Sequence, residues 1–404
     1  VCVCVFVCVC VCVRPFSGAL ARLEHRVVAG LCGGLRRRHP PSQRHRAGGN
    51  PDDRACQVSF LSTCLAGWLP AWLSTCRGQP VALSLTLVPA CVCAPASVPS
   101  VFDNARPGKL GRRGTAFYRR SFTDQIGGRS VGRLHFGACS FYCRVFVDGD
   151  EIGEHRASGY TPFWLDLPPS FAPVDSSGGS LAQKHELLVL VDSRYNRTTA
   201  PLHTGGDFYE FGGITRSVTL HQLPVNAAAA GASPVIVDGI AVIPTEDLQH
   251  VNVSLRLSGT GALPESVQLS FDGRATQTVG GSAVSGSELR LDNVALPSDA
   301  SAPWSVALPA LHNLTVTIPS SGDAVTARFG LRTLGVSSDG RLTINGDAIK
   351  LRGFNRHTMT PTSGSALTFE EVKRDVELLV EVGANFIRGA HYPQDQRFLD
   401  LCDE

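Results

Sequence analysis

From about Gly114 onward, the chain consists of short runs in which hydrophobic and polar residues alternate. Runs of this period, separated by Gly, Pro, Asp and Asn, are typical of strands in an all-β sandwich. In one run, Asp148-Gly149 lies between two alternating stretches, which is the strongest short signal for a β-hairpin. We therefore predict one sandwich over residues 112–224, with strands in "TAFYRRSFT", "VGRLHFGAC", "CRVFVDGDEIGEH", "HELLVLVDS" and "RSVTLHQL".

A second set of alternating runs follows the stretch "PVNAAAAGASP", from Pro224 to Pro234, whose Ala, Gly and Ser residues predict a linker. A segment of about a hundred residues with this pattern suits a single immunoglobulin-like sandwich. We assign this second sandwich to residues 234–334, with strands in "VIVDGIAVIP", "VNVSLRLSG", "SVQLSFDG", "SELRLDNVALP", "LTVTIP" and "VTARFGLRTLGV".

The pattern changes in residues 335–404, where strands and helices alternate. "LTINGDAIKLRGFNRH" predicts a hairpin about Asn345-Gly346 that leads into a strand, and "NFIRGAH" predicts a second strand. Thr368 and Glu371 form a capping-box pattern for the helix between these strands. "PQDQRFLDLCDE" predicts a second helix that has Pro393 in its first turn. Strand, helix, strand and helix in this order are the opening of a parallel α/β fold.

The first hundred residues differ from the rest in charge and in cysteine content. They hold ten Arg, no Lys and three acidic residues (10 − 3 = +7), whereas the other 304 hold 27 basic and 32 acidic groups (27 − 32 = −5). Eleven of the fourteen cysteines lie at or before Cys93, and the chain opens on "VCVCVFVCVCVCV". We interpret residues 1–111 as a disordered segment or as translated repeat DNA, with a damaged signal peptide as the alternative.

Three other features exclude or leave open particular classes of function. The basic run Arg36–Arg38 has no interleaved aromatic residues, so we expect no nucleic-acid partner. The apolar stretch Leu61–Leu73 is short and contains Pro70, so we expect no membrane span. The compartment stays open, and triplets at Asn196, Asn252 and Asn313 would accept glycans only in a secreted protein.

Candidate binding residues follow the two strands predicted in the C-terminal segment. The first strand ends at Asn355, Arg356 and His357, and the second at Arg388 and His391. In a parallel α/β barrel, the C-terminal ends of the strands share one mouth, where active sites lie. Histidines and arginines that converge there would form a pocket suited to hydroxyls and carboxylates. A histidine taken alone is more often an ordinary surface-loop residue, but arrival from two consecutive strands favours a shared site.

The motifs "LRGFNRH" and "VGANFIRGAHYPQDQRFLDLCDE", with "GEHRASGYTPFWLDL" and "DFYEFGGITRSVTL" upstream, resemble glycoside hydrolase family 2, the β-galactosidase and β-glucuronidase family. The resemblance covers about residues 112–404. It implies a multidomain chain with a jelly-roll sandwich of the galactose-binding type, an immunoglobulin-like sandwich and the start of a (β/α)8 TIM barrel.

The resemblance also implies roles for particular residues. His357 and His391 are expected to contact substrate hydroxyls, together with Asn355, and Arg388 to support the region of the nucleophile. Asp207, which opens "DFYEFGGITR", corresponds to the family residue that reaches into the barrel mouth; taken alone it would be a turn carboxylate after two glycines. By resemblance, sodium or magnesium is a candidate cofactor.

The carboxylates that would cut the glycosidic bond are not assigned. A retaining glycosidase needs two carboxyl groups about 5 Å apart, one as acid and base and one as nucleophile. In the family both are glutamates after later barrel strands, which we expect beyond Glu404. The acidic residues of the C-terminal segment are interpreted as solvated helix charges: Glu370, Glu371, Glu377, Glu381, Asp403 and Glu404.

The sequence therefore favours an exo-acting, retaining β-glycosidase of the β-galactosidase or β-glucuronidase type, seen without its catalytic pair. "EHRASGYTPF" and "DFYEFGGITR" lean towards β-glucuronidase. The expected partner is a β-glycoside, and a homo-oligomer stays open. Two alternatives remain: a non-catalytic carbohydrate-binding or scaffold protein built from the two sandwiches, and a defective gene model.

Overall fold

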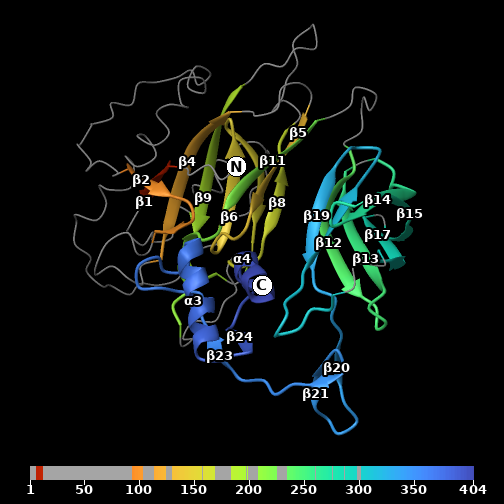
Figure 1. Cartoon of the computed structure of the whole chain (residues 1–404). Coiled ribbons are helices and arrows are strands. Elements are labelled where there is room, and N and C mark those ends of the chain that lie inside the picture. Colours follow the sequence, from red (N-terminus) through yellow and green to blue (C-terminus); the bar gives the residue numbers. More distant parts are fainter. Residues whose placement is uncertain are drawn as a thin grey trace, which may run out of the picture.

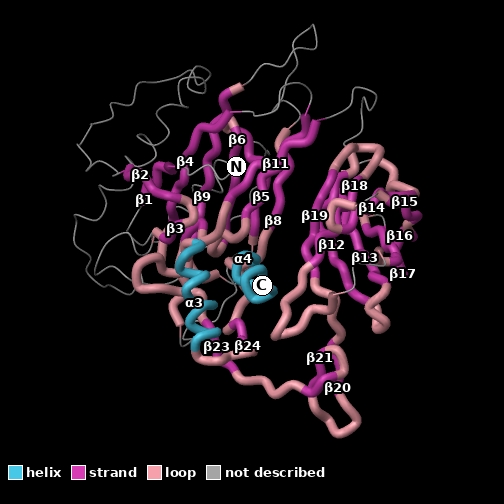
Figure 2. Tube along the Cα trace, viewed as in Figure 1, coloured by secondary structure: helices cyan, strands magenta, loops and turns pink. Residues whose placement is uncertain are grey.

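Two β-sandwiches and a C-terminal α/β segment follow one another along the chain (Figure 1). The structure is a computed structural model, and both helices that it describes lie in the C-terminal segment (Figure 2). It describes residues 6–11, 93–102, 113–123, 130–156, 158–168, 183–196, 198, 208–224, 234–259, 261–274, 276–285, 287–297 and 302–404.

The first sandwich packs a six-stranded antiparallel sheet against a three-stranded one. The larger sheet runs in the order β2 (Cys93–Ser97), β1 (Phe6–Val11), β4 (Thr115–Thr123), β9 (Lys184–Asp192), β6 (Tyr142–Val147) and β7 (Asp150–His155). The smaller runs in the order β11 (Val218–Pro224), β5 (Ser130–Phe136) and β8 (Phe163–Asp166). A two-stranded ribbon, β3 (Ser100–Val101) and β10 (Gly213–Ile214), completes it.

Alternation of side chains along the strands places the core of this sandwich between its sheets. In β9, buried and half-buried residues alternate, and Val189 and Val191 meet Tyr118 and Phe136 in the core. Successive side chains of a strand point to opposite faces, so only every second residue is buried. The predicted hairpin is confirmed, because β6 and β7 pair around Asp148-Gly149, both with positive φ.

Strands also occur before residue 112, where none was assigned to the sandwich. Strand β1 lies between β2 and β4 in the larger sheet, and Phe102, which follows β3, is 7% exposed in the core. The Phe102 amide donates to the Gly212 carbonyl at 3.0 Å. The described part of the sandwich thus begins before its predicted boundary, because β1 and β2 pair with each other and with β4, which a local pattern does not reveal.

The second sandwich consists of two four-stranded antiparallel sheets. Large aliphatic side chains from both sheets, among them Leu255, Leu269, Leu291 and Leu314, are at most 1% exposed in its core. One sheet holds β12 (Ile236–Pro244), β13 (His250–Ser258), β17 (Glu288–Ala295) and β16 (Ser282–Ser285). The other holds β15 (Gln277–Gly280), β14 (Ser266–Phe271), β18 (His312–Thr317) and β19 (Ala324–Phe329).

The C-terminal segment opens with a small antiparallel sheet and continues as strand, helix, strand and helix. The small sheet contains β20 (Leu334–Val336), β21 (Leu342–Ile344) and β22 (Asp347–Ala348), with the predicted turn at Asn345-Gly346. After it come β23 (Gly353–Arg356), α3 (Phe369–Glu381), β24 (Phe386–Gly389) and α4 (Gln396–Asp403). Strands β23 and β24 pair in parallel, as the sequence predicted.

The first turns of the two helices can be compared with the predicted helix starts. At the start of α3, Thr368 and Glu371 form both hydrogen bonds of a capping box, so that prediction is confirmed. The prediction for α4 is wrong by three residues. Its N-cap is Asp395, whose carboxylate accepts from the Arg397 amide, and Pro393 precedes the helix. An N-cap acceptor satisfies a backbone donor of the first turn, which a proline ring cannot do.

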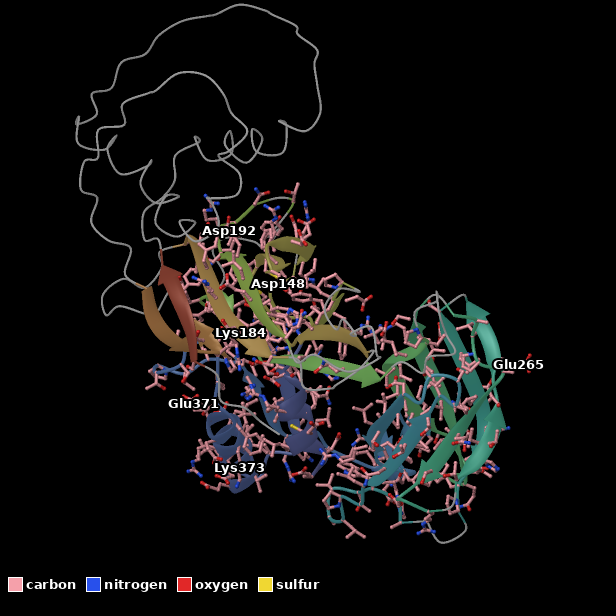
Figure 3. All side chains as sticks on the ribbon, turned by 90° about the horizontal axis from the view of Figure 1, so that it is seen from above. Asp148, Lys184, Asp192, Glu265, Glu371 and Lys373 are labelled. Carbon is pink, nitrogen blue, oxygen red and sulfur yellow. The ribbon has the colours of Figure 1, made fainter. Side chains whose placement is uncertain are left out.

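The α/β segment lies against both sandwiches. The indole Nε1 of Trp304 donates to the Asp403 carbonyl at 2.8 Å, and Arg328 pairs with Glu404, so α4 contacts the second sandwich. Seen from above, Glu371 and Lys373 of α3 lie beside the first sandwich, whereas Glu265 lies at the far edge of the second (Figure 3). Within the described residues, no helix is long and apolar enough to cross a bilayer.

Candidate functional site

The predicted binding residues of the C-terminal segment lie side by side at the ends of β23 and β24. Asn355 and Arg388 are cross-strand partners, and the Arg388 guanidinium donates to the Asn355 side-chain oxygen at 3.3 Å. Strand β23 ends at Arg356 and strand β24 at Gly389. The loops that follow these strands carry His357 and His391. Their imidazole rings meet edge to face, with centroids 5.2 Å apart. Parallel pairing thus brings both histidines to one edge of the sheet.

Arg356 does not join this group, which corrects the expectation that both arginines converge on the mouth. Its side chain is on the helix side, where it donates to Asp375 of α3 at 2.7 and 3.0 Å. Its guanidinium carbon lies 4.1 Å from the ring centroid of Phe398 in α4. Adjacent residues of a strand point to opposite faces, so Asn355 and Arg356 cannot both face the mouth.

Phe208 of the first sandwich covers the two histidines. Its ring centroid lies 4.9 Å from that of His357 and 5.7 Å from that of His391. The sequence analysis singled out the motif that contains Phe208 but chose Asp207, which lies outside the described residues. An aromatic residue beside the expected Asp was the signal available in the sequence. Phe208 shows that a segment of the first sandwich forms one wall of the mouth.

Two tyrosines that the sequence analysis did not select form a second contact between the sandwich and the mouth. Tyr160 and Tyr392 stack with centroids 4.0 Å apart and planes 5° from parallel. The hydroxyl oxygen of Tyr392 accepts from the Thr358 amide at 2.8 Å. Burial raises the pKa of both tyrosines, so each keeps its proton at neutral pH. Tyr392 directly follows His391, and the stack therefore fixes the loop that carries this histidine.

Arg216 also links the first sandwich to the loop that follows β24. Its guanidinium donates to the Tyr160 carbonyl at 2.8 Å and to the Pro393 carbonyl at 2.6 Å. It also lies 3.9 Å from the carboxylate of Asp395. Burial lowers the pKa of Arg216, although an arginine still stays charged throughout the physiological range. The first sandwich and the mouth are thus joined by stacked rings and by a half-buried cation.

His357 carries a polar atom that lacks a partner within the described part of the chain. Its Nδ1 is buried and forms no hydrogen bond there. A buried polar atom without a partner costs about 1–3 kcal/mol, and such atoms call for a specific explanation. An imidazole held in this way among Phe208, His391 and Tyr392 has a fixed position but retains hydrogen-bonding capacity.

The carboxylates of α3 and α4 are occupied with structural contacts. Glu371 accepts from Thr360, Thr362 and Ser363, each at 2.9 Å. Burial raises the pKa of Glu371, but the backbone bond from Thr368 and these hydroxyl bonds outweigh it and lower the pKa to about 2. The interpretation of Glu371 as a merely solvated charge is therefore wrong, because it organises the loop between β23 and α3.

Three further acidic residues of these helices pair with arginines elsewhere, whereas Asp375 pairs with Arg356 at the end of β23. Glu377 and Glu381 are exposed on α3 and contact Arg374, while Glu404 pairs with Arg328. No group of three or more His, Cys, Asp and Glu side chains suited to a metal ion occurs in the described ranges. Asp207, which the resemblance assigns to the barrel mouth, lies outside them.

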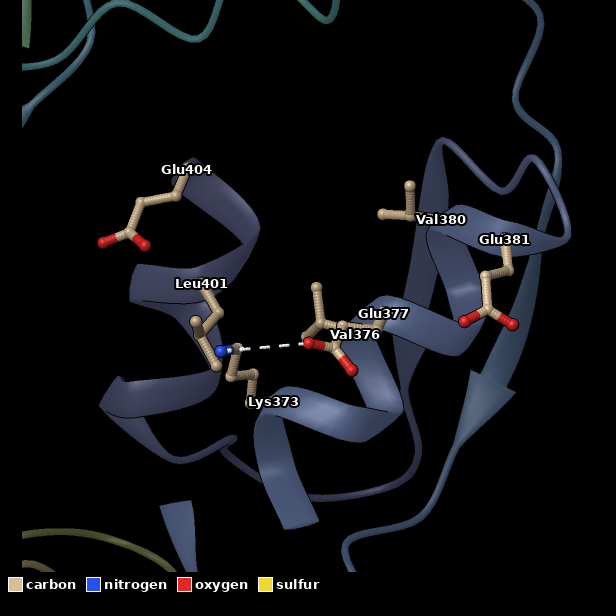
Figure 4. Close-up of a pocket in the computed structure, with 7 residues that line it drawn as sticks. All are labelled: Lys373, Val376, Glu377, Val380, Glu381, Leu401 and Glu404. Carbon is tan, nitrogen blue, oxygen red and sulfur yellow. Dashed lines mark ion pairs between the residues drawn. The ribbon is translucent and has the colours of Figure 1, made fainter. Parts of the chain in front are cut away.

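An open hollow of about 430 Å³ lies between α3 and α4 (Figure 4). Its lining combines aliphatic and charged side chains, and Lys373 lies 3.9 Å from Glu377, one turn further along α3. None of the strand-end residues lines this hollow, which belongs to the helix layer. The residues that line it are Lys373, Val376, Glu377, Val380, Glu381, Leu401 and Glu404.

Comparison with known proteins connects this geometry with one group of enzymes. Residues 336–404 match the family model described as "Glycosyl hydrolases family 2, TIM barrel domain". A β-galactosidase of Thermoanaerobacter pseudethanolicus is 28% identical over 299 residues, which are 72% of this chain and 38% of the relative. A putative β-glucuronidase of Formosa agariphila is 26% identical over 303 residues, 72% of this chain and 34% of the relative.

Solved structures agree with these sequence relatives. A family 2 β-galacturonidase of Eisenbergiella tayi, bound to galacturonate, superposes with a TM-score of 0.62 at 26% identity. The match covers 79% of this chain and 53% of that chain. A β-glucuronidase of Parabacteroides merdae, with a TM-score of 0.61 and 22% identity, shares the fold. The chain thus spans about a third to a half of the length of these proteins.

The multidomain, β-rich fold with a TIM-barrel part is similar to that of glycoside hydrolases. Within that class, residues 336–404 match the TIM-barrel domain of family 2, and the two sequence relatives resemble 72% of the chain at 26–28% identity.

Proposed function

We propose that this chain forms the sugar-binding side of an exo-acting, retaining β-glycosidase of the β-galactosidase or β-glucuronidase type. The observation that carries the proposal is the pair of imidazoles, His357 and His391, with ring centroids 5.2 Å apart at the ends of two parallel strands. Neutral imidazole offers one donor and one acceptor, which is the combination that a sugar hydroxyl needs.

Each residue of the mouth has a part in this proposal. His357 and His391 bind hydroxyl groups of the terminal sugar, and Phe208 provides an apolar wall against its ring. Asn355 orients Arg388 through the hydrogen bond of 3.3 Å, and Arg388 supports the side of the mouth where the nucleophile would act. Asp207 directly precedes Phe208 and is proposed as a further sugar ligand. No step of this proposal requires a metal ion.

The finer domain assignment belongs to the same proposal. We propose that residues 112–224, with the earlier strands, are a jelly-roll of the galactose-binding type. Residues 234–334 would be an immunoglobulin-like sandwich, which their two four-stranded antiparallel sheets support. Residues 335–404 would be the first part of a (β/α)8 barrel, because β23 and β24 pair in parallel and a helix follows each strand.

In this proposal, the described residues suffice for sugar binding but not for hydrolysis. Hydrolysis with retention requires two carboxyl groups about 5 Å apart at the scissile bond. Of the carboxylates on α3 and α4, Glu371 caps a helix, and Glu381 and Glu404 pair with arginines. We therefore expect the chain of 404 residues to bind sugars but not to release nitrophenol from nitrophenyl β-glycosides. Measurable release would contradict this part of the proposal.

Titration calorimetry with galactose, glucuronate and galacturonate tests the binding function. His357→Gln and His391→Gln should each weaken binding of the preferred sugar, while His250→Gln, at a half-buried position in the second sandwich, should not. If the two strand-end variants leave the affinity unchanged, the mouth is not the binding site. A carbohydrate-binding role of the sandwiches would then account for any remaining affinity.

A further inference from the structure

A partly buried hydrogen-bonded network in the first sandwich includes Glu210, two residues along the chain from Phe208. Arg113 donates to the Glu210 carbonyl at 2.9 Å, to the Ser193 carbonyl at 3.1 Å, and to the hydroxyl of Tyr195. Tyr195 in turn donates to the carboxylate of Glu210 at 2.7 Å. Glu210 is only 5% exposed. Arg113 thus holds the backbone of Glu210 directly and its side chain through Tyr195.

Aromatic rings enclose the cation of this network. The guanidinium carbon of Arg113 lies 3.9 Å from the ring centroid of Tyr195 and 5.3 Å from that of Tyr209. Burial and the hydrogen bond to Glu210 raise the pKa of Tyr195 to about 12, although Arg113 opposes the shift. The Tyr195 hydroxyl therefore keeps its proton at neutral pH and remains a donor to Glu210. A charged acceptor and an enclosed cation give the network strong hydrogen bonds.

Glu210 belongs to a segment that we call the 208–214 strap. The strap is fixed at its far end, where Gly213 pairs with Val101. Gly213 has φ of +153°, and a Cβ atom there would lie 2.3 Å from the Ser100 carbonyl oxygen, so only glycine fits. At the near end, Phe208 lies against His357 and His391. Between these two ends, Glu210 accepts hydrogen bonds from Arg113 and Tyr195, which fix this part of the strap.

We propose that Arg113, Tyr195 and Glu210 are positioning residues that hold Phe208 against His357 and His391, and thereby set the affinity of the mouth for sugar. The second half of this inference rests on the proposed function; the first half does not. Glu210 is no candidate for a carboxylate that contacts the sugar, because it is buried and accepts from Tyr195. In this proposal the network acts on Phe208 through the strap.

The position of Phe208 can be followed without any sugar. A phenyl ring shifts the NMR resonances of nearby protons through its ring current, and the imidazole carbon-bound protons of His357 and His391 lie within its range. Tyr195→Phe removes the hydroxyl but keeps the ring, and Glu210→Gln removes the charge but keeps the size. Both variants should move the two imidazole resonances towards their positions in Phe208→Leu. His357→Gln and His391→Gln assign the signals.

Glu186→Gln is the matched control, because it removes a carboxylate from an arginine pair, Arg119 with Glu186, on the exposed face of β4 and β9. It should leave both resonances in place. If Tyr195→Phe and Glu210→Gln also leave them in place while folding normally, the positioning role is wrong. Should Tyr195→Phe fail to fold, Glu210→Gln carries the same comparison.

Calorimetry adds the second measurement. Tyr195→Phe should weaken binding of the preferred sugar about tenfold, the effect of one lost hydrogen bond of about 1.4 kcal/mol. Unchanged affinity together with shifted resonances would overturn the link between Phe208 and sugar. If the unmodified chain binds no sugar, the proposed function fails, and the imidazole resonances alone decide whether the network positions Phe208.

Discussion

The imidazole of His357 stands edge-on to that of His391, with 5.2 Å between the ring centroids and 76° between the planes. The two residues follow different strands, and the parallel pairing of Asn355 with Arg388 brings them together. Because Phe208 contacts both rings, neither histidine can move without disturbing the other contacts.

This contact predicts that the two histidines act as a unit in sugar binding. His357→Gln and His391→Gln should each reduce affinity about tenfold, since each removes hydrogen bonds worth about 1–1.5 kcal/mol. The double variant should lose less than the product of the single effects, because residues in contact are coupled. A double-mutant cycle by titration calorimetry checks this. Fully multiplicative losses would show that the two histidines bind independently.

A second prediction concerns Arg216, which joins the first sandwich to the mouth. Arg216→Ala should lower the free energy of unfolding by about 2–3 kcal/mol, because it leaves the Tyr160 and Pro393 carbonyls without their charged donor. Arg119→Ala, which breaks an exposed ion pair in the same sandwich, should cost less than about 1 kcal/mol. Urea unfolding measures both variants. Equal losses would mean that Arg216 contributes no more than a surface charge.

A third prediction concerns Gly364, which packs so closely against the first sandwich that a larger side chain there should lower stability. Gly364 has φ of +57°, and a Cβ atom there would lie 2.9 Å from Phe211 and from Val101. Gly364→Ala should therefore cost about 1–3 kcal/mol for overpacking, in addition to about 1 kcal/mol for the left-handed backbone. Gly340→Ala tests the backbone cost alone, because its φ is +82° and nothing lies within 4 Å of its Cβ position. Thermal unfolding of both variants should rank Gly364→Ala as the less stable.

A fourth prediction follows from the low pKa of Glu371, which is about 2 against an ordinary value of 4.5. A carboxyl group whose pKa falls on folding stabilises the folded state above its unfolded pKa, and this contribution is lost as the pH falls towards the folded pKa. Glu371→Gln should thus be less stable than the parent chain above about pH 5, by about 1 kcal/mol, the difference between a charged and a neutral acceptor.

The difference between the parent chain and Glu371→Gln should shrink between about pH 4.5 and pH 2. Thermal unfolding across this range checks the prediction. Glu377→Gln, at an exposed position on the same helix, is the control and should show little difference at any pH. A constant gap for Glu371→Gln at every pH would assign its effect to shape instead of charge.

Local patterns in the sequence determined most strands, two hairpin turns and helix α3. The run "HELLVLVDS" became β9, and Asp148-Gly149 and Asn345-Gly346 became hairpin turns. The capping box at Thr368 and Glu371 formed as predicted. These features succeed because they depend on residues close in sequence: the period of a strand, the φ that a turn requires, and the acceptor that a helix end needs.

The sequence also indicated which side chains would gather at the strand ends, because parallel strands separated by a helix end at the same edge of the sheet. Asn355, His357, Arg388 and His391 could be selected in this way. The motifs that contain these residues resemble glycoside hydrolase family 2, and the comparisons support that resemblance.

Only the tertiary structure decided what covers those residues. Phe208, Tyr160 and Arg216 reach the mouth from the first sandwich, and no local period predicts such contacts. The same holds for the strands before residue 112 and for the network at Glu210. Their positions depend on how one sandwich packs against residues far along the chain. Packing of this kind follows from the shapes and hydrogen bonds of surfaces that exist only after the chain has folded.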